Sequence, residues 1–216
     1  MKNKLYIKSL ILGILVIFIG ASSLPSISGY NINSSIPYSN ENPINLFLSD
    51  DFVEAYWLFD ECDGDILHDS SVHGNDGTVI GPIWESYGSG CTLNFDGVDD
   101  YVDFDDHAYL DLGFNKSDDA IYSFKFQSTS TERGIIYSIC RGDQYGYNPG
   151  FHIALAGNGS IELQVWRLNC GIWMYSGENF NDGSWHFVEI FYNGETANPT
   201  AEIYIDGELE NTQKKW

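Results

Sequence analysis

Acidic side chains are concentrated in one short segment of this 216-residue chain. Six carboxylates stand within eleven residues, at Asp96, Asp99, Asp100, Asp103, Asp105 and Asp106. Such a group repels itself unless water, protons or a cation compensates its charge, and Ca²⁺ takes about six to eight oxygen ligands. We therefore expect Ca²⁺ as a cofactor, held by Asp96, Asp99, Asp100 and Asp60, the last from a smaller acidic group. The alternative is a solvated acidic surface, because neither group has EF-hand ligand spacing.

Aromatic side chains form the second candidate site, because a flat ring with a polar edge suits the apolar face of a sugar. The predicted ligand-binding residues are Tyr145, Tyr147, Trp166 and Trp173, with Tyr175 as a further candidate. Tyr145 and Tyr147 lie in a glycine-containing loop, and loops on a rigid scaffold often carry recognition. The alternative is that these rings pack in the core.

Motifs typical of catalysis are missing from the sequence. Neither a Gly-x-Ser-x-Gly nucleophile motif nor a phosphate-binding glycine loop occurs. His186 is a possible base, but a structural or exposed histidine is the simpler interpretation. We therefore predict no catalytic residues and no enzyme activity.

The N-terminus has the order of a secretory signal. Lys2, Lys4 and Lys8 precede an apolar run from 10 to 19, and small residues follow. The run is shorter than the roughly 20 residues of a membrane-spanning helix. We predict a signal peptide at 1–29, a linker at 30–50 and a folded domain at 51–216; the alternative is an uncleaved anchor. The protein is then secreted or held at the cell surface, without membrane insertion after cleavage.

Four cysteines, Cys62, Cys91, Cys140 and Cys170, fit an exported protein, in which disulfides persist. Three pairings are possible. We favour Cys62–Cys91 and Cys140–Cys170, because each pair could stand at the ends of adjacent strands. A zinc site is weaker because no C-x-x-C motif occurs, and buried free thiols remain an alternative.

Composition excludes several classes of protein. Ten basic against 31 acidic residues give a net charge of −21. Removing the three lysines of the predicted signal gives 7 − 31 = −24. Nucleic-acid binding depends on clustered Lys and Arg, so no nucleic-acid partner is expected. A hydrophobic content of 43% excludes a disordered chain.

Alternation of apolar and polar residues recurs along the chain, as in β-strands. Clear examples lie at 122–127, 161–166 and 202–206, and Asn-Gly or Asp-Gly turn signals separate many such segments. Trp185 is expected to anchor the core, with His186 facing the other way. About ten short strands without an amphipathic helix predict an all-β, antiparallel sandwich or jelly roll.

Five segments carry a family resemblance when taken in order. They are Ala55–Glu61, Asp69–Gly77, Leu93–Val102, Asp182–Val188 and Ile203–Gly207. Together they resemble the laminin G-like (LamG-like) jelly-roll domains of the concanavalin A-like lectin/glucanase group, over about residues 53–209.

The resemblance implies two curved antiparallel sheets packed face to face and an extracellular recognition role, often with Ca²⁺. Relatives of the laminarinase type carry Glu-x-Asp-x-x-Glu on one strand, and that spacing is missing here. Family members also continue into further strands, so we expect a C-terminally truncated jelly roll with an open sheet edge.

These observations predict a secreted, disulfide-linked recognition module that binds a glycan or an extracellular protein, with Ca²⁺ and without catalysis. A structural or adhesion spacer of a larger surface protein is the main alternative. A divergent glycoside hydrolase is the other.

Overall fold

The computed structural model describes residues 4–6, 10–20, 53–88, 90–104, 119–140, 150–167, 170–194 and 199–214. Within them the regular elements are strands. The first eight are β1 (Lys4–Tyr6), β2 (Leu10–Gly20), β3 (Val53–Trp57), β4 (Ile66–Leu67), β5 (Gly77–Ile80), β6 (Ile83–Tyr87), β7 (Gly90–Phe95) and β8 (Tyr101–Asp103). The other eight are β9 (Asp119–Gln127), β10 (Gly134–Cys140), β11 (Gly150–Leu155), β12 (Ile161–Arg167), β13 (Cys170–Tyr175), β14 (Trp185–Asn193), β15 (Thr200–Ile205) and β16 (Glu208–Lys214).

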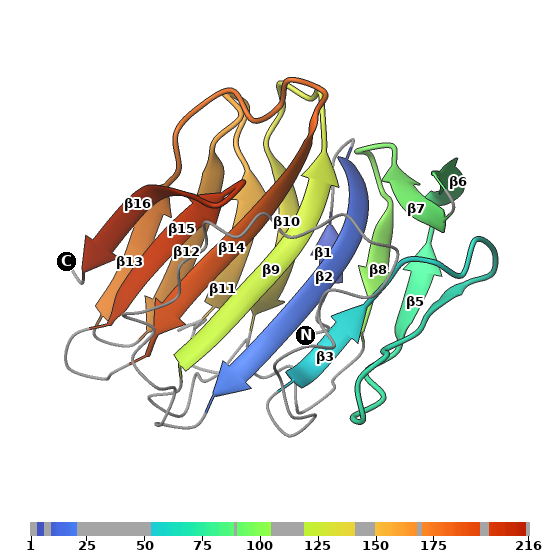
Figure 1. Ribbon diagram of the computed structural model, residues 1–216, viewed down its shortest axis with the longest axis horizontal. Helices are drawn as coiled ribbons and strands as arrows, with labels where there is room; N and C mark the ends of the chain where they lie inside the picture. The colour runs from blue at the N-terminus through green and yellow to red at the C-terminus, as the bar shows by residue number, and fades with distance from the viewer. Residues whose placement is uncertain are drawn as a thin grey trace.

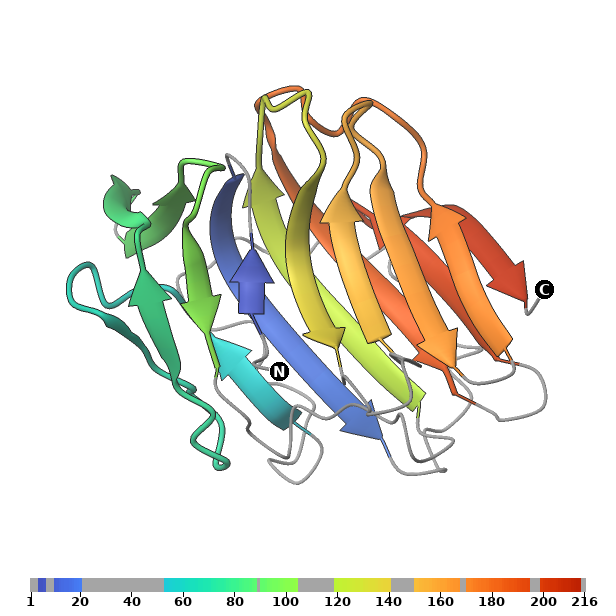
Figure 2. The same cartoon turned by 180° about the vertical axis from the view of Figure 1, so that it is seen from behind.

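The strands form two layers, which confirms the predicted all-β architecture (Figure 1). One layer is an eight-stranded sheet in the order β16-β15-β14-β9-β2-β7-β6, with β3 paired to β2. The other contains the sheet β10-β11-β12-β13 and, beside β10, the sheet β1-β8-β5-β4 (Figure 2). Every strand pair described is antiparallel. No helix in the described part of the chain is long and apolar enough to cross a membrane.

The core lies between the layers and follows the predicted period of two. On β9, Tyr122, Phe124 and Phe126 are all buried, as their alternation predicts. Across the interface, Tyr122 stacks on Phe151 of β11 with ring centroids 4.3 Å apart. These large rings fill the space between the sheets, so apolar burial is the main force that holds the two layers together.

On β14 the predicted facing of two residues is wrong. His186 is buried and Trp185 is only partly buried, because β14 turns its even-numbered residues inward. His186 packs against Phe126 and Phe180, and its ring nitrogens lie 2.7 Å from Asp206 Oδ2 and 3.2 Å from Asp182 Oδ1. Each ring nitrogen thus has a carboxylate beside it, and His186 shares the inner side of the strand with Val188 and Ile190.

The turn between β15 and β16 has the predicted type I′ character. Asp206 and Gly207 both have positive φ, at 53° and 85°, and Ile205 pairs with Glu208. A type I′ turn needs positive φ at both central positions, which Asp-Gly tolerates. Asp206 Oδ1 also accepts the Phe187 N–H, at 2.9 Å, which joins this turn to β14.

The apolar part of the predicted signal forms a central strand. β2 pairs with β9 on one side and with β7 and β3 on the other. It therefore links the two halves of the eight-stranded sheet (Figure 1). The boundaries at 29 and 50 remain predictions, and cleavage at the first would remove this strand.

Cys62 and Cys91 form a disulfide with a Cα–Cα distance of 5.3 Å, as predicted. Cys140 ends β10 and Cys170 begins β13, and the sheet order separates these strands by β11 and β12. Three strand spacings of about 4.8 Å exceed the roughly 7 Å that a disulfide spans between Cα atoms. The expectation that these two strands are adjacent is therefore wrong.

The segment Asp69–Gly77 is organised by one carboxylate. Asp69 accepts hydrogen bonds from the backbone N–H groups of Tyr56, Ser71 and Asn75, at 2.8–3.0 Å. It also accepts bonds from the Ser71 hydroxyl and the Asn75 amide. The buried Trp57 indole donates to the Asn75 carbonyl at 2.9 Å. The hydrogen bonds of Asp69–Gly77 thus hold this loop over the core, and the role of the segment is to stabilise the fold.

Candidate functional site

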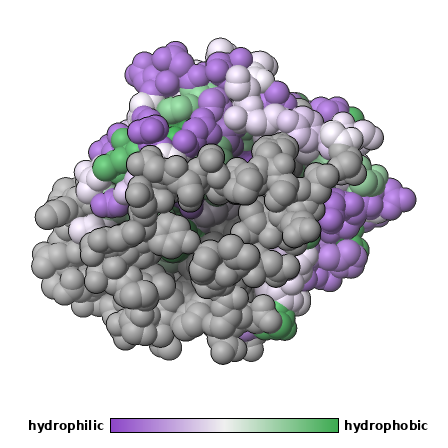
Figure 3. Space-filling view, viewed as in Figure 1, coloured by the Kyte–Doolittle hydropathy of each residue, from purple (hydrophilic) through white to green (hydrophobic). Residues whose placement is uncertain are grey.

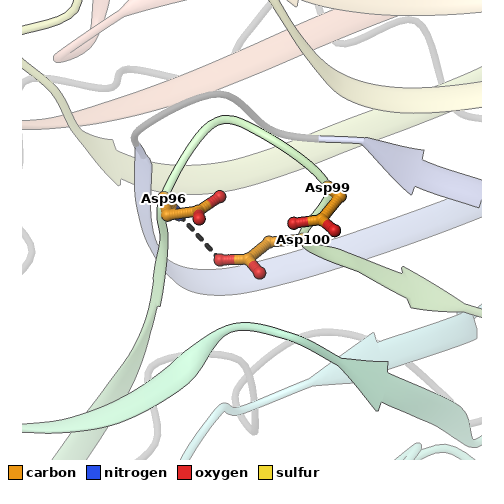
Figure 4. A group of neighbouring side chains, drawn as sticks. All are labelled: Asp96, Asp99 and Asp100. Carbon is orange, nitrogen blue, oxygen red and sulfur yellow. Dashed lines mark hydrogen bonds between the residues drawn. The ribbon is translucent and has the colours of Figure 1, made fainter.

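The acidic cluster lies in the turn between β7 and β8. Asp96, Asp99 and Asp100 bring one carboxylate oxygen each to within 4.8 Å of one another (Figure 4). Asp96 and Asp99 are exposed, whereas Asp100 is buried. Their closeness follows from the chain itself, because three residues of one tight turn cannot separate.

Asp100 also has a structural role in this turn. Its Oδ2 accepts the Asp96 N–H at 2.7 Å, and Asp96 Oδ1 accepts the Val98 N–H at 2.7 Å. Gly81 packs so closely that a side chain there would collide with Asp100 Oδ1. The chemistry of the three carboxylates fits a hard cation such as Ca²⁺, although part of their capacity is already used within the turn.

The remaining predicted acids are dispersed. Asp60 is exposed after β3 and does not belong to the group of three. Asp103 is buried on β8, whereas Asp105 and Asp106 lie outside the described residues. Hydrophilic residues also cover much of the described surface at the top and right of the view in Figure 3. A solvated acidic surface therefore remains the alternative for most of these carboxylates.

A second site lies on the outer face of the sheet β10-β11-β12-β13, which Figure 2 shows toward the viewer. Along β12, Ile161, Leu163 and Val165 point into the core, so Glu162, Gln164 and Trp166 point outward. Trp173 and Tyr175 of β13 lie on the same outward side, because Gln164 pairs with Trp173 and Glu162 pairs with Tyr175.

We call this surface the aromatic face; its residues are His152, Glu162, Gln164, Trp166, Trp173 and Tyr175. Its three large rings are partly exposed: 39% for Trp166, 50% for Trp173 and 41% for Tyr175. Glu162 and Gln164 are nevertheless buried, although they point away from the core. Polar groups that face outward yet are buried are covered by their neighbours, here by the rings on either side.

Glu162 is the centre of the polar network on this face. Its Oε2 accepts a hydrogen bond from Arg133 Nε at 2.7 Å. Its Oε1 accepts the Trp173 indole N–H at 2.9 Å, the Gln164 amide, and, at a longer 3.4 Å, the Tyr175 hydroxyl. Burial alone would raise the pKa of Glu162, but the Arg133, Gln164 and Trp173 hydrogen bonds and the Arg133 charge outweigh burial and lower it.

His152 of β11 extends the aromatic face from β12 toward β10. It pairs with Gln164 on one side and with Ser138 on the other, and its Nδ1 lies 3.1 Å from Ser138 Oγ. Its ring meets the Trp166 ring edge-on, with centroids 4.8 Å apart. Burial and the Arg133 charge lower the pKa of His152, so the imidazole is neutral near pH 7.

Of the four predicted ligand-binding residues, the structure places Trp166 and Trp173 on one surface. Tyr145 and Tyr147 lie outside the described residues. Glu162, Gln164, His152 and Arg133 carry no sequence motif that marks them as site residues. Alternation did place Glu162, Gln164 and Trp166 on one side of a strand, but their partners come from other strands. Arg133 is 29 residues away from Glu162, and no local spacing indicates that pair.

An antiparallel two-layer sandwich with polar and aromatic side chains on an outer sheet face is the architecture of a lectin-type jelly roll. A family model, Laminin_G_3, described as the concanavalin A-like lectin/glucanases superfamily, matches residues 96–215. The chain belongs to this family, and the match spans β8 to β16, including both the acidic turn and the aromatic face. Searches of curated proteins and of solved structures give no match.

Proposed function

We propose that this protein is an exported recognition module that binds a glycan on the aromatic face and does not catalyse a reaction. The main support is the set of three partly exposed rings, Trp166, Trp173 and Tyr175, beside fixed polar groups on one sheet face. Rings of this kind offer a large, rigid contact area with a polar edge. Membership of a superfamily of lectins and glucanases supports a carbohydrate as the ligand.

Binding without catalysis is supported by the carboxylates of this face. Retaining glycosidases need two carboxyl groups about 5–5.5 Å apart. Within the described residues of β10 to β13, Glu162 is the one acidic side chain, and both of its oxygens already accept hydrogen bonds. A divergent hydrolase would have to use carboxylates from elsewhere in the chain.

Export is supported by the Cys62–Cys91 disulfide, because such bonds persist in oxidising compartments. The proposed ligand is then an extracellular glycan. Ca²⁺ in the turn Asp96–Asp100 would stabilise one end of the sandwich, and we propose it as an accessory to the fold.

A glycan array screened with the purified protein, with and without Ca²⁺, tests this function. Affinities for each positive glycan are then measured by calorimetry for Trp173→Ala and Trp166→Ala. We expect each substitution to weaken binding at least tenfold. Tyr87→Ala is the matched control, because Tyr87 is equally exposed, at 48%, but lies on β6.

Three outcomes would contradict the proposal. Binding to proteins but to no glycan would favour a protein ligand. No binding at all would favour a structural or adhesion spacer of a larger surface protein. Release of reducing sugar from a bound glycan would instead support the alternative that the protein is a divergent glycoside hydrolase.

A further inference from the structure

We propose that Glu162 is a positioning residue that holds Trp173 and Tyr175 as preformed platforms for an uncharged glycan spanning more than one sugar unit. This inference deepens the proposed function and rests on it. It concerns the chemical class of the ligand and the residue that prepares the site, neither of which follows from family membership.

Glu162 acts through other residues because its side chain is buried beneath its partners, out of reach of a ligand. Its side chain is 3% exposed, and its oxygens accept bonds from Arg133, Gln164 and Trp173. A buried carboxylate that accepts several hydrogen bonds, one of them from an arginine, stays charged and in place. Its effect on binding therefore passes through the groups that it holds.

The group held most directly is an exposed ring. Trp173 is half exposed, yet its indole N–H is tied to a carboxylate beneath it. Tyr175, tilted by 38° to Trp173 with centroids 6.3 Å apart, reaches the same oxygen with its hydroxyl. An exposed aromatic side chain loses conformational freedom on binding, and a ring already fixed by a charged hydrogen bond avoids much of that cost.

The arrangement of the rings indicates a ligand with more than one stacking face. Trp166 and Trp173 are diagonal neighbours on β12 and β13, because Trp166 pairs with Gly171 and Trp173 with Gln164. Diagonal neighbours stand roughly 7–8 Å apart at their Cα atoms. Two separate rings on one surface suit two successive sugar units, rather than a single one.

The charges on this face indicate an uncharged ligand. Arg133 and Glu162 neutralise each other at 2.7 Å, and His152 is neutral near pH 7 because burial and the Arg133 charge lower its pKa. The whole chain carries −21, so an anionic glycan would also meet long-range repulsion. A neutral oligosaccharide meets neither obstacle.

A double-mutant cycle between Glu162→Leu and Trp173→Phe tests the positioning role. Trp173→Phe keeps an aromatic ring but removes the N–H that bonds to Glu162. Affinities are measured by calorimetry with neutral oligosaccharides of one, two and four units and with a sulfated analogue. We expect each single substitution to weaken tetrasaccharide binding at least fivefold. When Phe already stands at 173, Glu162→Leu should weaken binding by a clearly smaller factor than in the wild type, because, of its bonds to the two rings, only the one to Tyr175 is then left to lose.

Two controls accompany the cycle. Glu178→Gln removes an acid that is exposed beyond the end of β13, next to Asn158, and leaves the aromatic face unchanged. The chain has six tryptophans, so the environment of Trp173 is read as the difference in emission without ligand between a protein and its Trp173→Phe counterpart. We expect Glu162→Leu to shift this difference spectrum, whereas Glu178→Gln does not.

Each result has a defined meaning. Wild-type affinity in Glu162→Leu, together with loss of binding in Trp173→Ala, would overturn the positioning role and leave the proposed function intact. Stronger binding of the sulfated analogue, or equal binding of the single sugar, would overturn the ligand class. If Glu162→Leu does not fold, Trp173→Phe decides alone, since wild-type affinity in that variant overturns the proposal. Absence of glycan binding by the wild type would overturn both.

Discussion

At the scale of single residues, two carboxylates have unusually many partners. Asp69 accepts five hydrogen bonds in its loop, and Glu162 accepts four on the aromatic face. Such acids lower the free energy of the folded state because removal of one acceptor leaves several donors unsatisfied. Each leads to a prediction that concerns stability alone.

Replacing Asp69 by Ala should reduce the free energy of unfolding by about 3 kcal/mol, because several partly buried donors lose their acceptor. Urea denaturation measures the change. Asp65→Ala is the control, since Asp65 has an exposed side chain in the same region, and it should change stability by less than about 0.5 kcal/mol. Equal losses of stability in the two variants would show that the hydrogen bonds of Asp69 do not contribute to the free energy of unfolding.

Glu162 should make stability depend on acid pH. Because its pKa in the folded protein lies below the ordinary 4.5, its contribution is complete above the unfolded-state value and is lost as pH falls through the folded-state value. Melting temperatures of wild type and Glu162→Gln should therefore differ most well above the ordinary carboxyl pKa and converge as the pH falls through the lowered pKa of Glu162. A difference that does not change with pH would contradict the lowered pKa.

At the scale of elements, the turns determine how neighbouring strands meet. The β15–β16 turn uses positive φ at two residues, and the β7–β8 turn gathers three carboxylates. In both turns the sequence signal is local, because all the residues involved lie within about five positions. The two turns give predictions on backbone strain and on metal binding.

Gly207→Ala should cost about 1 kcal/mol, because an L side chain is disfavoured at the φ of 85° that this position has. No heavy atom stands within 4 Å of the new Cβ, so the cost comes from the backbone alone. Thermal unfolding measures it against Gly90→Ala on β7, where φ is ordinary and the nearest atom is 4.0 Å away. The interpretation fails if both variants lose the same stability.

Millimolar Ca²⁺ should raise the melting temperature, and EDTA should reverse the rise, because binding to the folded state alone stabilises it. Asp99→Asn should remove the rise, since Asp99 is an exposed member of the cluster. Asp60→Asn serves as the comparison, because Asp60 lies outside the group of three. No shift in the wild type at any Ca²⁺ concentration up to about 10 mM, roughly ten times the weakest dissociation constant typical of extracellular sites, would exclude the site.

At the scale of the whole molecule, one strand joins the two halves of the larger sheet. β2 stands between β9 and β7, and the inward residues of β9 and β7 belong to the core. The same segment is the apolar part of the predicted signal. Cleavage after the predicted signal would therefore remove β2, so a cleaved protein cannot contain this strand. The loss would expose the edge of β9, with which β2 pairs.

A chain that begins at residue 30 should bind more of a hydrophobic dye and self-associate, compared with the full chain. Without β2, the backbone of β9 along Ala120–Gln127 becomes a sheet edge, and such edges pair with other strands. Light scattering after gel filtration, together with dye fluorescence, measures both effects. A monomer with unchanged unfolding behaviour would show that β2 is dispensable.

Several features follow from the sequence by itself. Alternation placed Tyr122, Phe124 and Phe126 inside, the Asp206-Gly207 pair predicted a type I′ turn, and the density of acids located the cluster at Asp96, Asp99 and Asp100. These signals depend on residues a few positions apart. A local pattern is sufficient because strand period and turn conformation are local properties of the backbone.

Other features depended on the tertiary structure. The sheet order separated Cys140 from Cys170, and the strand pairing brought Trp173 and Arg133 to Glu162. On β14 the inner position went to His186 rather than Trp185, because the even-numbered residues of this strand face the core, and there Asp182 and Asp206 lie beside its ring nitrogens. Sequence shows which residues share one face of a strand, whereas strand order and register decide which residues of different strands meet. The acidic turn could therefore be predicted from the sequence, whereas the hydrogen bonds around Glu162 on the aromatic face could not.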